Sequence, residues 1–451
     1  MDLMKNEKII IVGAGLCGTL LAVRLAQRGF DVTLYEKRPD MRDDLLDSGR
    51  SINLALSNRG LLALDMANLK ESILKECIPM KGRMIHPLDQ GSFISPYSGR
   101  TADYINSVSR SGLNIMLLNE AEKYNNITLV FDASVINVDL QEANISYQID
   151  DEVKHDQGAV VIGTDGAGSA VRRGMMARTP ELLFNYSQDF LSHGYKELSI
   201  DPTEDGQWKI EKEVLHIFPR GEFMMIALPN LDGSFTLTMF HPYGTDIGFN
   251  NLDTKEKVQS FFESYYPTLL PYVPHYQEEF FQNPVGNLGT IKCYPWQAFG
   301  KTLIMGDASH AIVPFYGQGM NASLEDVRIF DEVLEEYGTD WGKVFSIFQE
   351  KRKHNADAIA DLAIDNFYEM RDHVDDDVFK KKRQIEMQLE QEFPDYYSKY
   401  SLVTFKPELP YKEAMKRGRK QDELLLDMCR QENFENIPLE DYYNKIRSLA
   451  L

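Results

Sequence analysis

Cysteines, basic residues and long hydrophobic runs are all scarce in this chain of 451 residues. Its four cysteines are far apart and include no C-x-x-C pair, so neither a zinc site nor a disulfide framework is indicated, and a reducing compartment fits. The 48 Lys and Arg residues are outnumbered by 69 Asp and Glu residues, which leaves a formal charge of −21. Such a charge repels phosphates at long range and argues against a strong nucleic-acid binder.

The longest apolar stretch, residues 9–23, contains three glycines, is followed directly by Arg24 and lacks a small-residue cleavage site. It therefore does not have the form of a secretory signal. No later segment reaches the roughly 18 uncharged apolar residues that a membrane-spanning helix needs. The C-terminal residues from Lys416 onward are charged and interrupted. We expect a soluble, cytoplasmic protein without a membrane anchor.

The composition, with 43% hydrophobic and 26% charged residues, is that of an ordinary globular protein. A chain of this size buries roughly three quarters of its unfolded surface, enough for two or three domains. Residues 8–36 read as a strand, a helix and a second strand, the pattern of a parallel β-α-β unit. Apolar runs at 159–163 and 301–306 predict two more strands of the same sheet, so other segments must be inserted between them.

The segment 182–290 consists of extended runs separated by Pro, Gly and the turn tetrad 230–233, which predicts an antiparallel sheet. After residue 320, apolar residues recur every three or four positions, which predicts helices. The predicted fold class is α/β, or α+β overall, with a Rossmann-like domain, an inserted antiparallel sheet and a C-terminal helical region.

The glycines of the first β-α-β unit form a G-x-G-x-x-G directly after a strand and at the start of a helix: Gly13, Gly15 and Gly18. The first permits the tight turn, the second lets a pyrophosphate approach the backbone, and the third lets helix and strand pack closely. Glu36 ends the second strand, where an acidic residue accepts hydrogen bonds from an adenosine ribose. A carboxylate there would repel a 2′-phosphate, so the motif predicts FAD or NAD as the bound nucleotide.

Two later segments also place polar residues after apolar strands. Asp165 and Gly166 follow the run at 159–163, and Gly306 and Asp307 follow the run at 301–306. A glycine-rich stretch, 317–321, then opens a helix, where backbone amides can stabilise negative charge. Each segment alone is weak evidence. His310, three residues after Asp307, is expected to be a packed or capping histidine rather than half of an acid-base pair.

Taken together and in this order, these segments resemble the class A flavoprotein aromatic hydroxylases of the p-hydroxybenzoate hydroxylase type, over residues 8 to about 330. The resemblance implies that FAD is the bound cofactor and that Asp307 binds its ribitol. It also implies that Arg110 lies near the FAD phosphates or ribose, and that Asp165 lies where FAD and a nicotinamide cofactor meet. The remaining residues implied to contact the cofactor are Gly317, Gln318, Gly319, Met320 and Asn321.

A narrower resemblance, to the kynurenine 3-monooxygenase family, extends over nearly the whole chain. It is carried by the strings at 49–60, 82–87, 193–198, 218–240, 314–326 and 400–405, several of which have no general role in FAD binding. It implies four substrate-binding residues: Arg83, Tyr97, Asn366 and Tyr400. Arginine offers a planar fork for a carboxylate, and tyrosine hydroxyls can add hydrogen bonds. Tyr316 stands at a variable position of this family, near the flavin.

The resemblance implies an NADPH- and O₂-dependent hydroxylation of L-kynurenine to 3-hydroxy-L-kynurenine, in tryptophan degradation and NAD biosynthesis. The flavin, through its C4a-hydroperoxide, performs the chemistry, and no side chain is catalytic. Only one G-x-G-x-x-G is present, so NADPH is expected to bind transiently. No group of His, Cys and carboxylate residues has metal-ligand spacing. The alternatives are a flavin monooxygenase of the same fold with another aromatic substrate and an NAD-dependent dehydrogenase, and oligomeric state stays open.

The implied domains combine segments from distant parts of the chain. The FAD-binding domain comprises residues 1–75, 100–181 and 291–345. The substrate-binding sheet comprises 76–99 and 182–290. The C-terminal helical region, 346–451, is expected to cover the active site.

Overall fold

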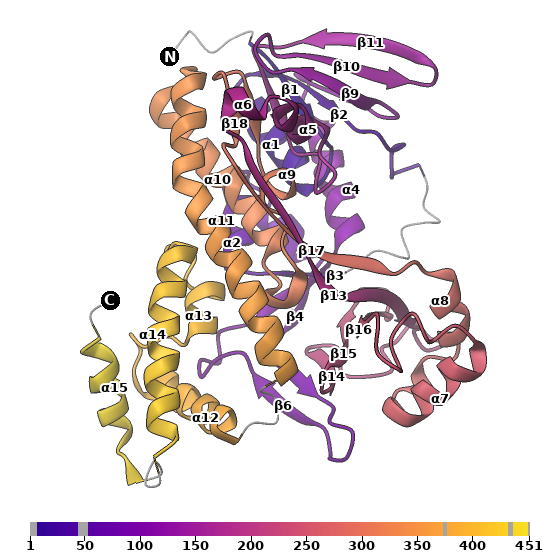
Figure 1. The fold of residues 1–451 in the computed structure, drawn as a ribbon, viewed down its shortest axis with the longest axis vertical. Helices are drawn as coiled ribbons and strands as arrows, with labels where there is room; N and C mark the ends of the chain where they lie inside the picture. The colour runs from indigo at the N-terminus through magenta and orange to yellow at the C-terminus, as the bar shows by residue number, and fades with distance from the viewer. Residues whose placement is uncertain (1–6, 44–52, 373–376, 432–435, 450–451) are drawn as a thin grey trace.

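The computed structural model describes residues 7–43, 53–372, 377–431 and 436–449. Residues 49–52 of the string 49–60 lie outside the described residues. In the ribbon view, long helices run beside a sheet at one end of the molecule and reach a second sheet at the other end (Figure 1).

The sheet at the N-terminal end has six strands in the order β18-β19-β12-β1-β2-β8. All neighbouring pairs are parallel except β18 with β19. The strands predicted at 8–12, 159–163 and 301–306 therefore do belong to one parallel sheet. Its strands are β1 (Lys8–Val12), β2 (Asp31–Tyr35), β8 (Ile127–Val130), β12 (Val160–Gly163), β18 (Gln297–Ala298) and β19 (Thr302–Ile304).

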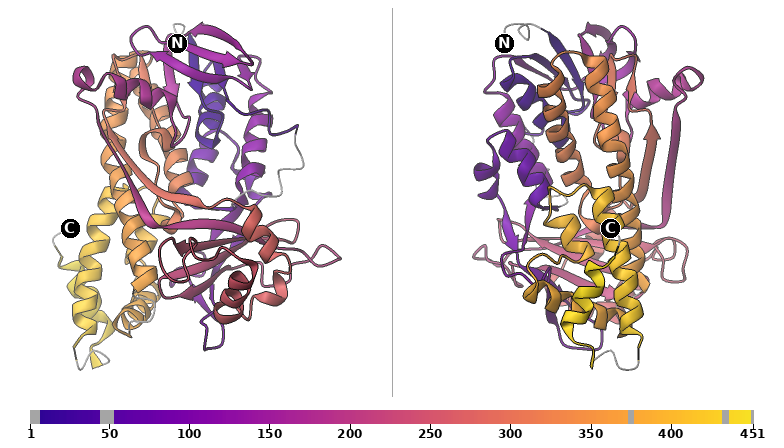
Figure 2. Two further views of the ribbon diagram at one scale, coloured as in Figure 1. Left: turned by 45° about the vertical axis from the view of Figure 1, so that its right-hand side comes forward. Right: turned by 90° about the vertical axis from the view of Figure 1, so that its left-hand side faces the viewer.

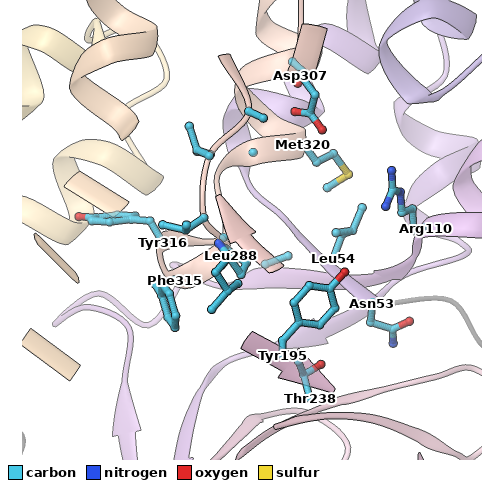
Figure 3. A pocket seen from close by; sticks show the side chains of 18 of the residues that line it. Asn53, Leu54, Arg110, Tyr195, Thr238, Leu288, Asp307, Phe315, Tyr316 and Met320 are labelled. Atoms are coloured by element: carbon cyan, nitrogen blue, oxygen red, sulfur yellow. The ribbon is translucent and has the colours of Figure 1, made fainter. Parts of the chain in front are cut away.

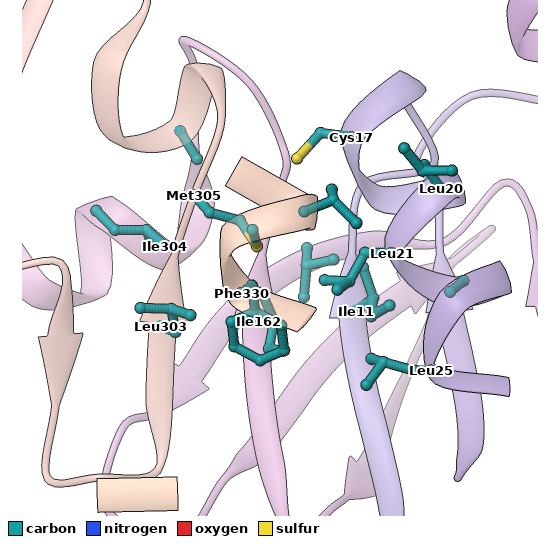
Figure 4. Packing of buried hydrophobic residues seen from close by; sticks show 14 of the residues in the cluster. Ile11, Cys17, Leu20, Leu21, Leu25, Ile162, Leu303, Ile304, Met305 and Phe330 are labelled. Carbon is teal, nitrogen blue, oxygen red and sulfur yellow. The ribbon is translucent and has the colours of Figure 1, made fainter. Parts of the chain in front are cut away.

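Helices α1 (Leu16–Gln27) and α10 (Gly319–Tyr337) pack against this sheet. Ile11 and Ile162 from its central strands meet Leu21 of α1 and Phe330 of α10, and all four are 0–1% exposed (Figure 4). Central parallel strands are covered on both faces, which is why β1 and β12 read as continuous apolar runs rather than as alternating ones. This core holds the glycine turn after β1 in place.

The second sheet has seven strands in the order β17-β13-β16-β15-β14-β5-β6. It is antiparallel except between β5 and β14. The turn predicted at 230–233 joins β15 to β16, and Gly233 there has a φ of +88°. Its strands are β5 (Gly82–Ile85), β6 (Phe93–Pro96), β13 (Asn185–Ile200), β14 (Leu215–Arg220), β15 (Phe223–Pro229), β16 (Phe235–Pro242) and β17 (Gly286–Tyr294).

The segment 182–290, which is predicted to form an antiparallel sheet, also contains helices that the sequence patterns did not indicate. These are α7 (Lys255–Tyr265), the 3₁₀ turn η2 (Leu270–Tyr272) and α8 (Tyr276–Gln282). Their aromatic side chains, with those of the sheet, form a separate core around Phe262 and Tyr266. The helices lie on the outer side of the sheet, away from the C-terminal helices (Figure 2).

Smaller elements connect and flank the two sheets. A three-stranded sheet, β3-β7-β4, lies at their junction, and an exposed meander, β9-β10-β11, flanks the first sheet. The elements are β3 (Asn53–Leu56), β4 (Ile78–Met80), β7 (Ile105–Ser109), β9 (Ser134–Asp139), β10 (Asn144–Ile149), β11 (Glu152–Gln157), α2 (Asn58–Met66), α3 (Lys70–Leu74), α4 (Arg110–Ala121), α5 (Ala170–Ala177), α6 (Thr179–Leu182), α9 (Asp307–His310) and η3 (Pro314–Tyr316).

The C-terminal region is helical, as the apolar spacing predicts. It comprises α11 (Trp341–Asp372), α12 (Asp377–Glu392), α13 (Lys399–Thr404), α14 (Tyr411–Cys429) and α15 (Leu439–Arg447). In Figures 1 and 2, α11 runs from the first sheet to the second, and α13 and α14 lie beside its lower half. None of the described helices is long and apolar enough to cross a bilayer.

The Rossmann-like sheet, the mostly antiparallel second sheet and the helical C-terminal region confirm the predicted fold class. The residue boundaries proposed for the three domains stay a prediction.

Candidate active site

One large cavity lies between the two sheets and the C-terminal helices. Its volume is about 1410 Å³, above the roughly 300–1,000 Å³ of a pocket for one small ligand. Its lining begins at Gly13 and Glu36, passes Asp307 and Met320, and continues to Arg83. A cavity of this size and continuity accommodates a dinucleotide together with a second, smaller molecule.

The three glycines of the first turn have different surroundings. A Cβ on Gly13, where φ is +105°, would lie 2.7 Å from the Cα of Asp165. A Cβ on Gly18 would lie 2.1 Å from the carbonyl oxygen of Gly13. A Cβ on Gly15 would meet nothing within 4 Å, because this residue faces the cavity at the N-terminus of α1. The first and third glycines thus permit close packing, and the second leaves room for a phosphate group.

Glu36 follows β2 and lines the same end of the cavity. Its Oε2 accepts a hydrogen bond of 2.9 Å from the amide of Ala14, and its Oε1 accepts one of 2.8 Å from Nε of Arg38. Burial raises the pKa of this carboxyl, but Arg38 and the amide hydrogen bonds outweigh burial and hold the pKa below its ordinary value. An ionised acceptor therefore stands beside the glycine turn, as a ribose ligand requires.

Asp307 begins α9 just after β19, with its side chain exposed to the cavity. Arg110 begins α4, on the other side of the cavity, and Met320 lies between them (Figure 3). Enclosure by the surrounding chain raises the pKa of Asp307, against the opposing effects of Arg110 and His310. Among the described residues, Arg110 forms no ion pair, so its guanidinium is available to an anionic group in the cavity.

Asp165 and Gly166 also line the cavity, after β12. The Oδ2 of Asp165 accepts a hydrogen bond of 2.6 Å from the amide of Ala170, at the start of α5. Its Oδ1 is buried and has no hydrogen-bond partner among the described residues. One carboxylate oxygen is therefore used to hold α5. A role for Asp165 at a meeting point of two cofactors stays a prediction.

The glycine-rich segment 317–321 supplies backbone and one side chain to the cavity. Gly317, with a φ of +66°, lines it together with Gly319 and Met320. The side chain of Gln318 turns away, and its Oε1 accepts a hydrogen bond of 2.9 Å from the hydroxyl of Tyr411. Asn321 also binds chain atoms, donating to the carbonyl of Gly317 at 2.9 Å. Any contact of these two residues with a cofactor would thus involve their backbone rather than their side chains.

These surroundings fit FAD along the length of the cavity. The open space at Gly15 and the acceptor Glu36 suit its nucleotide half, and the exposed carboxylate of Asp307 suits a polyol. The N-terminus of α10 brings its positive end to the position where Gly317, Gly319 and Met320 line the cavity. The dinucleotide predicted from the first turn is therefore matched by residues from three separate parts of the chain.

The predicted substrate residues gather at the other end of the cavity. The guanidinium of Arg83, on β5, lies 4.8 Å from the ring centre of Tyr97 and 4.4 Å from that of Tyr400, on α13. The two rings are nearly parallel, with an interplanar angle of 10°. Within the described part of the chain, the guanidinium of Arg83 has no carboxylate partner and no hydrogen bond, although Arg83 lines the cavity. A half-buried cation of this kind is a site for a ligand carboxylate.

The two other predicted substrate residues are Tyr97 and Asn366. The hydroxyl of Tyr97 is buried without a hydrogen-bond partner in the described structure. Burial raises its pKa, so the hydroxyl stays protonated. Asn366, on α11, lines the cavity and donates a hydrogen bond of 2.6 Å to the carbonyl of Phe315. The structure thus brings Arg83, Tyr97 and Tyr400 into contact, and Asn366 lines the same cavity, whereas Tyr97 is fully buried and does not line it. The role of the four residues in substrate binding stays a prediction.

An apolar compartment adjoins Arg83, and its residues were not predicted individually. Tyr195, on β13, directs its hydroxyl into the cavity, opposite Phe315 (Figure 3). The strings 193–198 and 218–240 contribute to the family resemblance. No periodicity in them, however, distinguishes the residues that face the cavity from those that pack in the core. The apolar lining comprises Ile85, Leu215, Ile217, Met224, Ile226, Leu228, Phe240 and Phe315.

The structure confirms that His310 is a packed histidine, as the sequence predicts. Its Nε2 lies 2.5 Å from Oδ2 of Asp326, its ring packs on that of Trp296, and it is 3% exposed. It does not pair with Asp307. No group of His, Cys, Asp and Glu among the described residues is arranged to hold a metal ion.

Comparison with protein families identifies two segments of this site. Residues 11–42 match the model of an NAD(P)-binding Rossmann-like domain, and residues 284–361 match the model of an FAD binding domain. The first contains the glycine turn and Glu36, and the second contains Asp307 and the segment 317–321.

Curated relatives match almost the whole chain. A kynurenine 3-monooxygenase of Myxococcus xanthus is 44% identical over 95% of this chain and 92% of its own length. One of Dictyostelium discoideum is 43% identical over 97% of this chain and 96% of its own. A third, of Flavobacterium psychrophilum, is 41% identical over 99% of both chains.

Solved structures share the fold at lower identity. The 2-methyl-3-hydroxypyridine-5-carboxylic acid oxygenase superposes with a TM-score of 0.66 at 18% identity, covering 82% of this chain and 94% of its own. The p-nitrophenol 4-monooxygenase of Pseudomonas putida gives a TM-score of 0.68 at 14% identity, covering 91% and 99%. At such identities the likeness establishes the fold alone.

Proposed function

Because this chain belongs to the kynurenine 3-monooxygenase family, we propose that it hydroxylates L-kynurenine at ring position 3. It is an FAD-dependent monooxygenase that acts on a small molecule. The proposed reaction converts L-kynurenine, NADPH, a proton and O₂ into 3-hydroxy-L-kynurenine, NADP⁺ and water. One oxygen atom of O₂ enters the ring. The other is reduced to water by the two electrons of NADPH.

The observation that carries this proposal is the unpaired Arg83 beside an apolar compartment, in the same cavity as the FAD site. L-Kynurenine has the matching form, an amino-acid carboxylate joined to an aromatic ring. The guanidinium of Arg83 binds the carboxylate, while Tyr97, which is fully buried and does not line the cavity, supports this guanidinium with its ring. Tyr400 packs on Arg83 and restricts its rotamers, so that the fork is oriented before the substrate arrives.

The aromatic ring of the substrate then occupies the apolar compartment between Arg83 and the FAD site. Phe240 and Phe315, whose ring centres are 4.9 Å apart, form part of its wall. Bound FAD supplies the redox chemistry, which consists of accepting hydride and activating O₂ for transfer to the ring. The protein orients the ring and excludes water, which limits loss of the activated oxygen as hydrogen peroxide.

NADPH is the proposed reductant, and it binds transiently. The nucleotide site beside the glycine turn presents the ionised Glu36, which would repel a 2′-phosphate. This site is therefore suited to FAD, and the nicotinamide nucleotide approaches from elsewhere.

The test is to incubate purified protein with FAD, NADPH, L-kynurenine and air, and to identify the product by mass. We expect a mass increase of one oxygen atom and a requirement for O₂. A product formed without O₂ would indicate a dehydrogenase. NADPH oxidation stimulated by other aromatic acids but not by kynurenine would indicate a different substrate for the same flavin chemistry.

A further inference from the structure

Three of the strings that characterise the sequence, at 49–60, 314–326 and 400–405, meet at one buried arginine. Arg59, on α2, is 1% exposed. Its Nε donates a hydrogen bond of 2.8 Å to the carbonyl of Val403, and its Nη1 donates one of 2.9 Å to Oε1 of Glu325. Arg59 does not line the cavity, so contact with cofactor or substrate does not explain it.

On one side, Arg59 holds the chain that follows α13. Its Nη2 donates to the carbonyls of Leu409, at 2.5 Å, and Lys406, at 3.2 Å. Its guanidinium also lies 3.9 Å from the ring centre of Tyr411. Because α13 carries Tyr400 and ends at Thr404, these bonds fix the helix that holds one wall of the Arg83 site.

On the other side, the contacts lead to the cofactor site. Oε2 of Glu325 accepts a hydrogen bond of 2.6 Å from Arg352, whose Nε donates at 2.6 Å to Oδ1 of Asp326. Oδ2 of Asp326 accepts a hydrogen bond of 2.9 Å from the amide of Gly306. Gly306 directly precedes Asp307, so the chain of contacts ends at the turn that presents Asp307 to the cavity.

The four side chains Arg59, Glu325, Arg352 and Asp326 form what we call the buried ion network. Each is at most 3% exposed, and the two carboxylates are also approached from outside the network, Asp326 by His310 and Glu325 by Arg328. Buried charges are tolerated only with such complete pairing, and a guanidinium fork supplies several donors in one rigid plane. The network therefore holds its backbone partners in one arrangement.

A second connection runs in parallel. The hydroxyl of Tyr411, whose ring lies against Arg59, donates a hydrogen bond of 2.9 Å to Gln318. Gln318 directly precedes Gly319, the first residue of α10. The C-terminal helices are thus connected to both loops that line the cofactor half of the cavity.

We propose that the buried ion network is a positioning device for hydroxylation: Arg59 and Asp326 keep the substrate anchor at Tyr400 in register with the cofactor anchor at Asp307. This proposal rests on the proposed function. Arg59 and Asp326 are positioning residues, because neither lines the cavity. A displacement of about 1 Å caused by a remote change can lower a reaction rate by roughly a hundredfold. Here such a displacement releases activated oxygen as hydrogen peroxide before it reaches the ring.

The main test is Arg59→Lys, which keeps the charge but replaces the planar fork with a single ammonium group. Purified holoenzyme is compared with wild type for 3-hydroxykynurenine and hydrogen peroxide formed per NADPH consumed. We expect product per NADPH to fall at least about threefold, with hydrogen peroxide rising to match. The matched control is Arg24→Lys, which alters an ion pair of 2.9 Å between α1 and Asp331 of α10, away from the C-terminal helices. Its product yield per NADPH is expected to equal that of wild type.

The cofactor end is tested without turnover. Asp326→Asn keeps the size of the side chain but removes its charge, and we expect the FAD dissociation constant, measured by flavin fluorescence, to rise about tenfold. An unchanged dissociation constant would overturn the role of Asp326.

The outcomes separate the two proposals. Wild-type enzyme that makes no 3-hydroxykynurenine refutes the proposed function and this inference with it. Folded Arg59→Lys enzyme with wild-type product yield refutes the positioning role alone, whatever its melting temperature. If Arg59→Lys yields no folded holoenzyme, Glu325→Gln decides, because it keeps the size of the side chain but removes the charge that joins Arg59 to Arg352. We expect a loss of product per NADPH in that variant, and an unchanged yield would overturn the proposal.

Discussion

Replacing Arg83 with methionine should separate substrate binding from cofactor binding. Methionine keeps an unbranched side chain that replaces the aliphatic stem of arginine, but it is shorter and removes the charge and the hydrogen-bond donors that lie against Tyr97 and Tyr400. Arg83 has no ion pair among the described residues, so its loss leaves no carboxylate of the protein without a partner. We therefore expect the Arg83→Met variant to fold and to retain FAD.

The magnitude follows from the contacts that the carboxylate would lose. A bidentate arginine–carboxylate pair has two charge-assisted hydrogen bonds, each contributing about 1.5 kcal/mol, or about 3 kcal/mol together. This corresponds to roughly a 150-fold increase in the dissociation constant of L-kynurenine. Because Arg83 is only half-buried, the loss of binding free energy should be smaller than that seen when one partner of a fully buried ion pair is removed.

The assay is a titration of the oxidised holoenzyme with L-kynurenine, followed by the change in flavin absorbance. A kynurenine analogue that lacks the carboxylate serves as ligand control and should bind wild type and Arg83→Met alike. Arg178→Met serves as protein control, because Arg178 packs on Phe299 with its guanidinium 4.6 Å from the ring centre and does not line the cavity. A dissociation constant for L-kynurenine that changes less than about threefold would refute the assignment of Arg83.

Three further predictions concern the cofactor end and the buried charges. Glu36→Ala removes the acceptor of the Ala14 amide, so we expect about tenfold weaker FAD retention, measured by flavin content after equilibrium dialysis; equal content would contradict the ribose role. Gly15→Ala should lower FAD affinity without changing the melting temperature of the apoprotein, because the added Cβ would meet no protein atom within 4 Å. Gly18→Ala should destabilise the apoprotein by about 1–3 kcal/mol, because its Cβ would lie 2.1 Å from a carbonyl oxygen. Pairing with His310 and Arg352 outweighs burial and lowers the pKa of Asp326 from 3.8 to about 2. Because folding lowers this pKa, the ionised carboxylate contributes about 2 kcal/mol to the free energy of unfolding above pH 4, and this contribution is lost as the pH falls towards 2. The difference in the free energy of unfolding between wild type and Asp326→Asn should therefore shrink between about pH 4 and about pH 2.

Much of the first sheet could be predicted from the sequence because its signals are local. A strand, a glycine turn and a helix follow one another within residues 8–36, and their periodicity and spacing indicate the fold of this unit and a dinucleotide ligand, with FAD and NAD both left open. Helices α7 and α8 were not predicted, because they are short and lie among strands of similar apolar content. Their structure depends on packing against the second sheet.

The predicted substrate residues show the limit of local signals more clearly. By itself, Arg83 has the sequence context of any exposed arginine, and only the family resemblance singled it out. Its environment consists of Tyr97, which is close in sequence, and Tyr400, which is more than three hundred residues away. Arg59 was part of a recognised string, but no sequence pattern indicates that its partners would be the carbonyls of 403–409 and Glu325.

The amino-acid sequence alone was enough to locate the parallel nucleotide-binding unit, the residues of its glycine turn and the acidic residue that follows its second strand. These depend on interactions between neighbours along the chain, whose geometry follows from backbone conformation and side-chain period. Which face of each later strand lines the cavity, and the buried ion network between its two ends, could be seen only in the folded molecule. Burial and charge pairing depend on distances between segments far apart in the chain, and these distances exist only after the sheets and helices have packed.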